Sequence, residues 1–202
     1  MQPDPQEVAK RIKALREDLQ ISAQEMAEAT GRSQQSYLDQ ESGVADLSFT
    51  FLYKCAQRLG VDVVELLTGE SPKLNAYELT RAGQGLSILR RSGFEYLHLA
   101  PFFKDKLCEP FIVTAPYLLS EQDQPIHLSY HSGQEIDYII SGRLRFAYED
   151  QVEELRAGDT LYYDSGRGHG MVAVGGEPCV FLAVVIKPAV ALPNPPEVLD
   201  IS

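Results

Sequence analysis

The sequence has no tryptophan, only three cysteines and a deficit of basic residues, with 18 Lys+Arg against 29 Asp+Glu and a formal net charge of −11. This acidic balance argues against a general electrostatic attraction to nucleic acid or to an anionic membrane. In other respects the composition is ordinary, with 44 % hydrophobic and 23 % charged residues over 202 positions. A chain of this length and composition is expected to fold into one or two globular domains.

Long hydrophobic segments are also missing. The longest apolar run, residues 179–186, has eight residues, whereas a membrane-spanning helix needs roughly 20. The first residues show neither the basic nor the apolar part of a secretory signal. The cysteines (Cys55, Cys108 and Cys179) are odd in number and lie among apolar neighbours, so we expect free thiols. These absences predict a cytoplasmic protein without a membrane partner.

Residues 1–68 have the patterns of short helices. Apolar residues recur at helical spacing in the first segment (Val8, Ile12, Leu15 and Leu19). Ser22 followed by Glu25 has the spacing of a capping box. Serines also precede the segments expected to form the third and fourth helices (34–40 and 49–59), and a fifth helix is expected at 63–67. This part of the chain is therefore predicted to be an all-α domain.

The pattern changes to short strands after a predicted linker at 69–85. Nine strands are expected, at 86–90, 94–99, 111–115, 128–131, 136–140, 143–148, 160–163, 170–174 and 180–186. Many short strands separated by turns indicate an antiparallel sandwich or barrel, here an all-β domain over 86–187. Residues 188–202 are proline-rich and form a tail that cannot pair in a central strand. The predicted fold class is thus α+β.

Four segments of the helical part carry a family resemblance. RIKALRE (11–17), ISAQEMA (21–27), TGRS (30–33) and ESG (41–43) resemble the XRE or lambda-repressor family of helix-turn-helix domains. The resemblance implies that the third helix enters the major groove of double-stranded DNA. It places five residues at or near bases and phosphates, namely Arg32, Ser33, Gln34, Gln35 and Ser36; glutamine suits bidentate contact with adenine. A helical packing module that reads no DNA is the alternative.

A second resemblance lies in the strand part. His131 and Glu135 are four residues apart, and Gly142 and the run DSGRGH (164–169) follow at the spacings of the two cupin motifs. Inward-pointing residues of a small barrel can converge, so His131, Glu135 and His169 are candidate metal ligands. Two imidazoles and a carboxylate are typical of non-haem iron(II), and zinc, manganese or nickel would also fit. A polar pocket without metal is the alternative.

A ligand pocket is expected around these residues. Tyr96 and His98 share one face of a predicted strand. Ser129 stands where the first histidine of the cupin motif is usual, and Tyr138 lies close to the motif in sequence. We therefore expect Tyr96, His98, Ser129 and Tyr138 to line the pocket.

The order of the two domains resembles regulators that combine an XRE-type head with a cupin. That resemblance implies a homodimeric transcription regulator with a small-molecule effector, such as a carboxylic acid. Hydroxypropylphosphonate epoxidase has the same order of domains and the same His, Glu, His pattern. The alternative function is therefore a mononuclear iron(II) oxidoreductase, and the sequence leaves open whether the cupin is catalytic.

Overall fold

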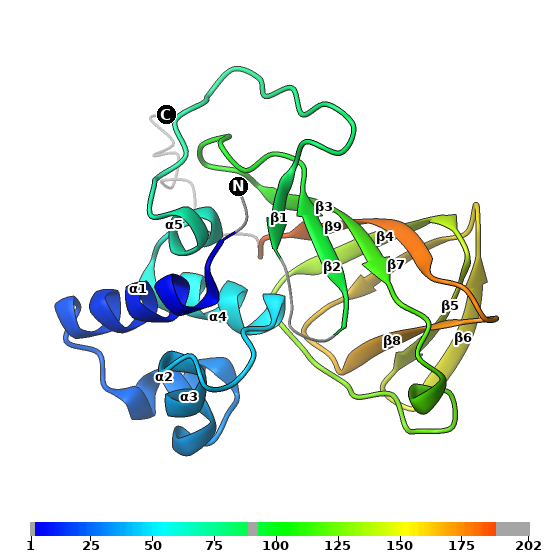
Figure 1. Ribbon diagram of the computed structural model, residues 1–202, viewed down its shortest axis with the longest axis horizontal. Coiled ribbons are helices and arrows are strands. Elements are labelled where there is room, and N and C mark those ends of the chain that lie inside the picture. Colours follow the sequence, from blue (N-terminus) through cyan, green and yellow to red (C-terminus); the bar gives the residue numbers. More distant parts are fainter. Residues whose placement is uncertain (1–2, 89–92, 189–202) are drawn as a thin grey trace, which may run out of the picture.

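The computed structural model describes residues 3–88 and 93–188, which form a helical part followed by a β-rich part (Figure 1). The helices are α1 (Pro5–Asp18), α2 (Ala23–Thr30), α3 (Gln34–Glu41), α4 (Phe49–Leu59) and α5 (Val63–Thr68). The strands are β1 (Leu86–Ile88), β2 (Glu95–His98), β3 (Cys108–Ala115), β4 (Gln134–Ser141), β5 (Arg143–Tyr148), β6 (Gln151–Arg156), β7 (Thr160–Asp164), β8 (His169–Val174) and β9 (Cys179–Ile186). The expected α+β class is confirmed. Within these two ranges, no helix has the length and apolar character needed to cross a bilayer.

Helices α2, α3 and α4 start directly after the predicted serines. The hydroxyls of Ser22, Ser33 and Ser48 each accept a hydrogen bond of 3.2 Å from the backbone N–H three residues on. The backbone N–H of Ser22 donates to Glu25 at 2.8 Å, which completes the capping box. These bonds satisfy donors that a helix start leaves unpaired. Gly31 ends α2 with φ +68°, a left-handed conformation that glycine adopts without strain, so the chain turns at once into α3.

The strands form two antiparallel sheets. One sheet has six strands in the order β1-β2-β3-β9-β4-β7, and the other has three in the order β6-β5-β8. On β3 and β9, buried residues alternate with half-buried ones. Phe111, Val113, Ala183 and Val185 are each at most 2 % exposed and form part of the core. This alternation is what a strand with one face on the core requires.

Three expectations about the helices and strands are wrong. Strand β6 was not expected, because it is exposed over most of its length at the edge of its sheet and lacks apolar alternation. Residues 128–131 form no strand; Ser129 alone pairs there, with His169. Leu19, expected on the buried face of the first helix, follows the end of α1 and is 50 % exposed. By contrast, residues 69–85, expected to be a linker, hold no helix or strand.

Two expectations fall partly on residues that the structure does not describe. The strand expected at 86–90 continues into residues 89–90, which lie outside the described ranges. The predicted proline-rich tail at 188–202 lies outside them from residue 189 onward.

Helix α4 connects the helical part with the sheets. The ring of Phe49 lies 5.4 Å from that of Tyr96, nearly parallel to it, and 4.7 Å from that of Phe111 at 69°. One turn later, the ring of Tyr53 meets the edge of His131 at 5.6 Å. Such aromatic pairs contribute about 0.5–1.5 kcal/mol each beyond the area they bury. The buried apolar residues of both parts accordingly form one continuous cluster.

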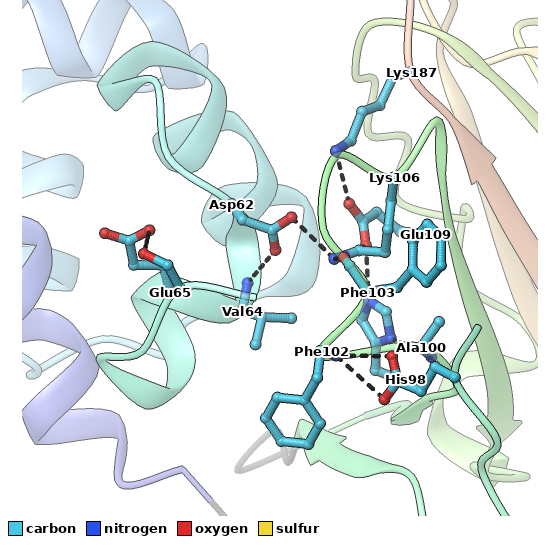
Figure 2. Close-up of polar contacts among 12 residues, drawn as sticks. Asp62, Val64, Glu65, His98, Ala100, Phe102, Phe103, Lys106, Glu109 and Lys187 are labelled. Atoms are coloured by element: carbon cyan, nitrogen blue, oxygen red, sulfur yellow. Dashed lines mark hydrogen bonds and ion pairs between the residues drawn. The ribbon is translucent and has the colours of Figure 1, made fainter. Parts of the chain in front are cut away.

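A buried group of charges lies beside this aromatic contact (Figure 2). Lys106 Nζ is 2.9 Å from Asp62 Oδ2 on the helical side and 3.8 Å from Glu109 Oε2 on β3. Glu109 also pairs with Lys187 at 3.1 Å and His98 at 2.7 Å. Only 3 % of the Lys106 side chain and 1 % of the Glu109 side chain are exposed. Buried charges are stable only when paired, and Lys106 provides this pairing across the boundary between the two parts.

Replacing Lys106 with methionine is expected to lower the free energy of unfolding by about 1–3 kcal/mol. Asp62 loses its buried partner, whereas Glu109 retains Lys187 and His98. Urea denaturation of the full chain measures the change. Lys104→Met is the control, because the Lys104 side chain is 59 % exposed. Equal stability of the two variants would contradict a stabilising role for Lys106.

Candidate metal centre and its cavity

Three buried side chains from separate segments converge inside the barrel. Glu135 lies on the inward face of β4, and His169 is the first residue of β8. His131 lies just before β4, where its backbone N–H donates to Ser165 O at 2.8 Å. One possible ligand atom from each of the three lies within 4.8 Å of the other two. The structure thus brings the three predicted metal ligands together.

A hydrogen bond behind the ring of His169 determines its orientation. His169 Nδ1 lies 2.9 Å from the backbone oxygen of Arg167. Because a carbonyl only accepts, Nδ1 carries the proton and Nε2 keeps a free lone pair. Burial lowers the pKa of His169, which favours the neutral ring, although the Arg167 carbonyl acts in the opposite direction. Metal-binding histidines in proteins are oriented by this kind of contact.

The distance between His131 and Glu135 also fits a shared ion. His131 Nε2 is 3.1 Å from Glu135 Oε2. Two atoms that each lie about 2.1 Å from one ion, at right angles around it, are about 3 Å apart. The donor set of two imidazoles and one carboxylate suits iron(II), zinc, manganese or nickel. The residues present therefore fit a divalent metal.

Asp137 is a second buried carboxyl beside this site, and the sequence analysis missed it. It follows Glu135 by two positions on the inward face of β4 and is fully buried. Burial raises the pKa of Asp137 well above its ordinary value, and the charge of Glu135 raises it further. Asp137 is thereby held towards its neutral form next to the metal ligands. The two-residue spacing from Glu135 was the signal that could have identified it.

The three candidate ligands open onto a cavity of about 580 Å³. Its walls come from both parts of the chain. The helical part contributes Thr30, Gly31, Arg32, Ser48, Phe49, Thr50 and Lys54. The barrel contributes an aromatic wall of Phe94, Tyr96, Phe111 and Phe181 and the segment 124–131. The cavity therefore lies between the two parts.

Two of the four residues expected in the pocket line this cavity, and two do not. Tyr96 and Ser129 are on its wall. His98 is fully buried at the domain junction, where its Nε2 is bonded to Glu109. Tyr138 is 46 % exposed, because alternation along β4 turns Glu135 inward and Tyr138 outward. The placement of His98 and Tyr138 in the pocket is therefore corrected.

The predicted DNA contacts lie in the turn after α2 and at the start of α3. Gln34 and Gln35 are exposed, as contact with a partner requires. Gln35 Nε2 donates to Asp39 Oδ1 at 2.8 Å along the same helix. Ser33 and Ser36 are joined by the cap that starts α3. Their roles towards DNA remain predictions.

Arg32, the fifth of these residues, also borders the cavity. Its guanidinium lies 5.7 Å from the centre of the Phe51 ring. Partial burial lowers the pKa of Arg32, but a guanidinium remains charged in proteins. The structure thus places Arg32 both next to α3 and on the wall of the cavity.

Comparison with domain families identifies both parts. Residues 9–72 match a helix-turn-helix domain, and residues 120–185 match a cupin domain. The chain therefore carries an XRE-type helix-turn-helix domain followed by a cupin domain. This architecture supports a DNA-binding regulator with a cupin domain.

Two solved structures are similar to this chain over most of its length. A crystal structure of an HTH_3 family transcriptional regulator from Vibrio cholerae is 21 % identical, with a TM-score of 0.65, over 92 % of this chain and 97 % of that chain. At this identity the similarity shows a shared fold. Hydroxypropylphosphonic acid epoxidase from S. wedmorenis is 18 % identical, with a TM-score of 0.47, over 92 % of this chain and 100 % of that chain. A search of curated protein sequences found no significant match.

Replacing His169 with alanine removes one of the three candidate ligands. We expect the affinity for Zn²⁺ to fall by at least about 100-fold, which is more than the loss caused by replacing a residue that only orients a ligand. Dialysis against buffered Zn²⁺ followed by elemental analysis measures the change. His127→Ala is the matched control, because His127 is exposed and is not one of the grouped ligands. Full metal retention by the His169 variant would refute the triad.

Proposed function

We propose that this chain is a cytoplasmic transcription regulator whose cupin barrel senses a small molecule and holds a divalent metal. One observation carries the proposal: the cavity onto which the candidate metal ligands open is walled in part by the helix-turn-helix domain. Small-molecule sites occur preferentially at such domain interfaces. A molecule bound there would contact both the barrel and the domain that reads DNA.

His131, Glu135 and His169 would hold the metal, and Ser129 offers only a hydroxyl where many cupins have a fourth ligand. A bound ion would supply positive charge and open coordination positions for an oxygen or nitrogen atom of the effector. The protein's own groups prepare this site. The Arg167 carbonyl fixes the proton of His169 on Nδ1, and the aromatic wall gives the cavity an apolar face.

Two contacts support communication between the site and the DNA-reading domain. The ring of Tyr53 packs against the candidate ligand His131. Ser132 Oγ, on the next residue, donates to Gln57 Oε1 at 2.9 Å. Both Tyr53 and Gln57 belong to α4, so a shift of His131 would be transmitted to that helix. The effector changes DNA affinity only by as much as it favours one domain placement over another.

Replacing Gln34 and Gln35 with alanine is expected to weaken specific DNA binding. Each bidentate contact to a base contributes about 1–3 kcal/mol, which is roughly 5- to 150-fold in affinity. Fluorescence anisotropy with DNA from upstream of the protein's own gene measures the loss. Gln151→Ala, an exposed glutamine of the barrel, is the control.

A protein that binds no specific DNA sequence would instead favour the oxidoreductase. Absence of sequence-specific binding by the unaltered protein, together with oxygen consumption by the iron-loaded protein on a small acid or phosphonate, would contradict the proposed regulator.

A homodimer is part of the proposal, because helix-turn-helix proteins bind two half-sites about one helical turn apart. Exposed sheet edges such as β6 also favour pairing between copies. Light scattering is expected to give at least twice the mass of one chain. A mass near that of a single chain would refute the dimer.

A further inference from the structure

We propose that the cavity binds a small organic anion whose charge is matched by Arg32 and Lys54 of the helix-turn-helix domain, and that this anion competes with DNA for Arg32. The anion site rests on the cavity and on a divalent ion at the three candidate ligands. The competition rests on the proposed function, because it requires the chain to bind DNA.

Lys54 is directed from α4 towards the barrel. Its Nζ lies 3.7 Å from the centre of the Tyr130 ring and donates to the backbone oxygen of Thr30 at 3.3 Å. Partial burial lowers the pKa of Lys54, and the nearby charge of Arg32 lowers it further. Lys54, Arg32 and the three candidate metal ligands line the same cavity.

Neither cation has a carboxylate partner in the described parts of the chain. Arg32 lies over Phe51, and Lys54 lies over Tyr130. Lys106, in contrast, has carboxylates on both sides of it. Lys54 is half-buried and Arg32 beside it is exposed. A half-buried cation without a counter-charge, next to a second cation, is unfavourable. A bound anion would supply the missing counter-charge, so the cavity is expected to bind anions in preference to neutral molecules.

The charges around the cavity also favour an anion. Among the described residues that line it, the cations are Arg32 and Lys54, and the carboxylates are Glu135 and the exposed Glu121. These charges cancel, so a divalent ion on the three ligands would make the cavity positive. The chain as a whole carries −11. A local positive cleft in an acidic protein concentrates anions.

The aromatic part of the cavity wall suits an apolar body on this anion. Phe94, Tyr96, Phe111 and Phe181 of the barrel and Phe49 of α4 face the same cavity. Its volume of about 580 Å³ lies within the range of roughly 300–1,000 Å³ that is usual for small-molecule sites. An alkyl or aryl chain carrying one negative group therefore matches both the wall and the cations.

The turn between α2 and α3 connects this site to DNA reading. Arg32 directly precedes Ser33, the cap of α3. The barrel packs closely against the same turn, because a Cβ on Gly31 would collide with the hydroxyl of Tyr130. An anion that pairs with Arg32 withdraws this side chain from DNA phosphates. Anion and DNA should then weaken each other's binding by the same factor.

Calorimetry on the zinc-loaded full chain tests the anion site. The probes are acetate, butyrate, hexanoate, octanoate and phenylacetate, each compared with its neutral amide, and hexylphosphonate, compared with its dimethyl ester. At least one anion should bind about ten-fold or more tightly than its neutral counterpart, as expected for charge-assisted hydrogen bonds. Lys54→Met should reduce this preference by weakening the anion more than its neutral counterpart, whereas Lys54→Arg should restore it.

Lys13→Met, an exposed lysine of α1, is the control and should leave the preference intact. If no anion of the series binds more tightly than its neutral counterpart, or if Lys54→Met keeps the full preference, the anion site is refuted. DNA binding by the same preparations shows independently whether the proposed function holds.

Anisotropy with the upstream DNA tests the competition. The anion that binds most tightly should lower DNA affinity at saturation, and Arg32→Met should lose this effect. Unchanged DNA affinity at saturating anion would overturn the competition. A chain that selects anions through Lys54 but binds no DNA would retain the anion site and contradict the regulator.

Discussion

Helix α4 has to be buried on two sides at once, and the relation between the domains depends on this constraint. Phe51 and Cys55 face the helical core, where Phe51 lies 5.9 Å from Tyr37. Phe49 and Tyr53 face the barrel. A helix that is apolar around most of its circumference is stable only when surrounded by protein. The DNA-reading domain is thus packed against the barrel instead of being joined to it by a free tether.

The same packing explains how an acidic chain uses its few basic residues. Lys106 is buried between carboxylates at the domain junction. Arg16 of α1 pairs with the buried Glu41 at 2.6 Å and is only 13 % exposed. Arg32 and Lys54 face the cavity. Because the chain is acidic and some of its cations are paired inside, any attraction to DNA depends on few phosphate contacts and on specific contacts to bases.

Two buried pairs of histidine and carboxylate show why the same residue types can differ in role. At the junction, His98 Nδ1 accepts from the N–H of Ala100 at 3.0 Å, so Nε2 carries the proton that it shares with Glu109. Both ring nitrogens are therefore used. In the barrel, His131 Nε2 faces Glu135 within reach of His169 and of the cavity. Only the second pair is open to a metal or a ligand, because the N–H of Ala100 and the carboxylate of Glu109 occupy both ring nitrogens of His98.

Local patterns in the sequence determined the helices and the candidate metal ligands. Serine caps and apolar spacing act within a few residues, so they predict where helices start. His131, Glu135 and His169 were selected through the resemblance of their surroundings to the cupin motifs. Tertiary structure decided the rest, because burial depends on which distant segments meet. It removed His98 and Tyr138 from the pocket, placed Asp137 beside the candidate metal ligands and brought Arg32 and Lys54 to the cavity between the two domains.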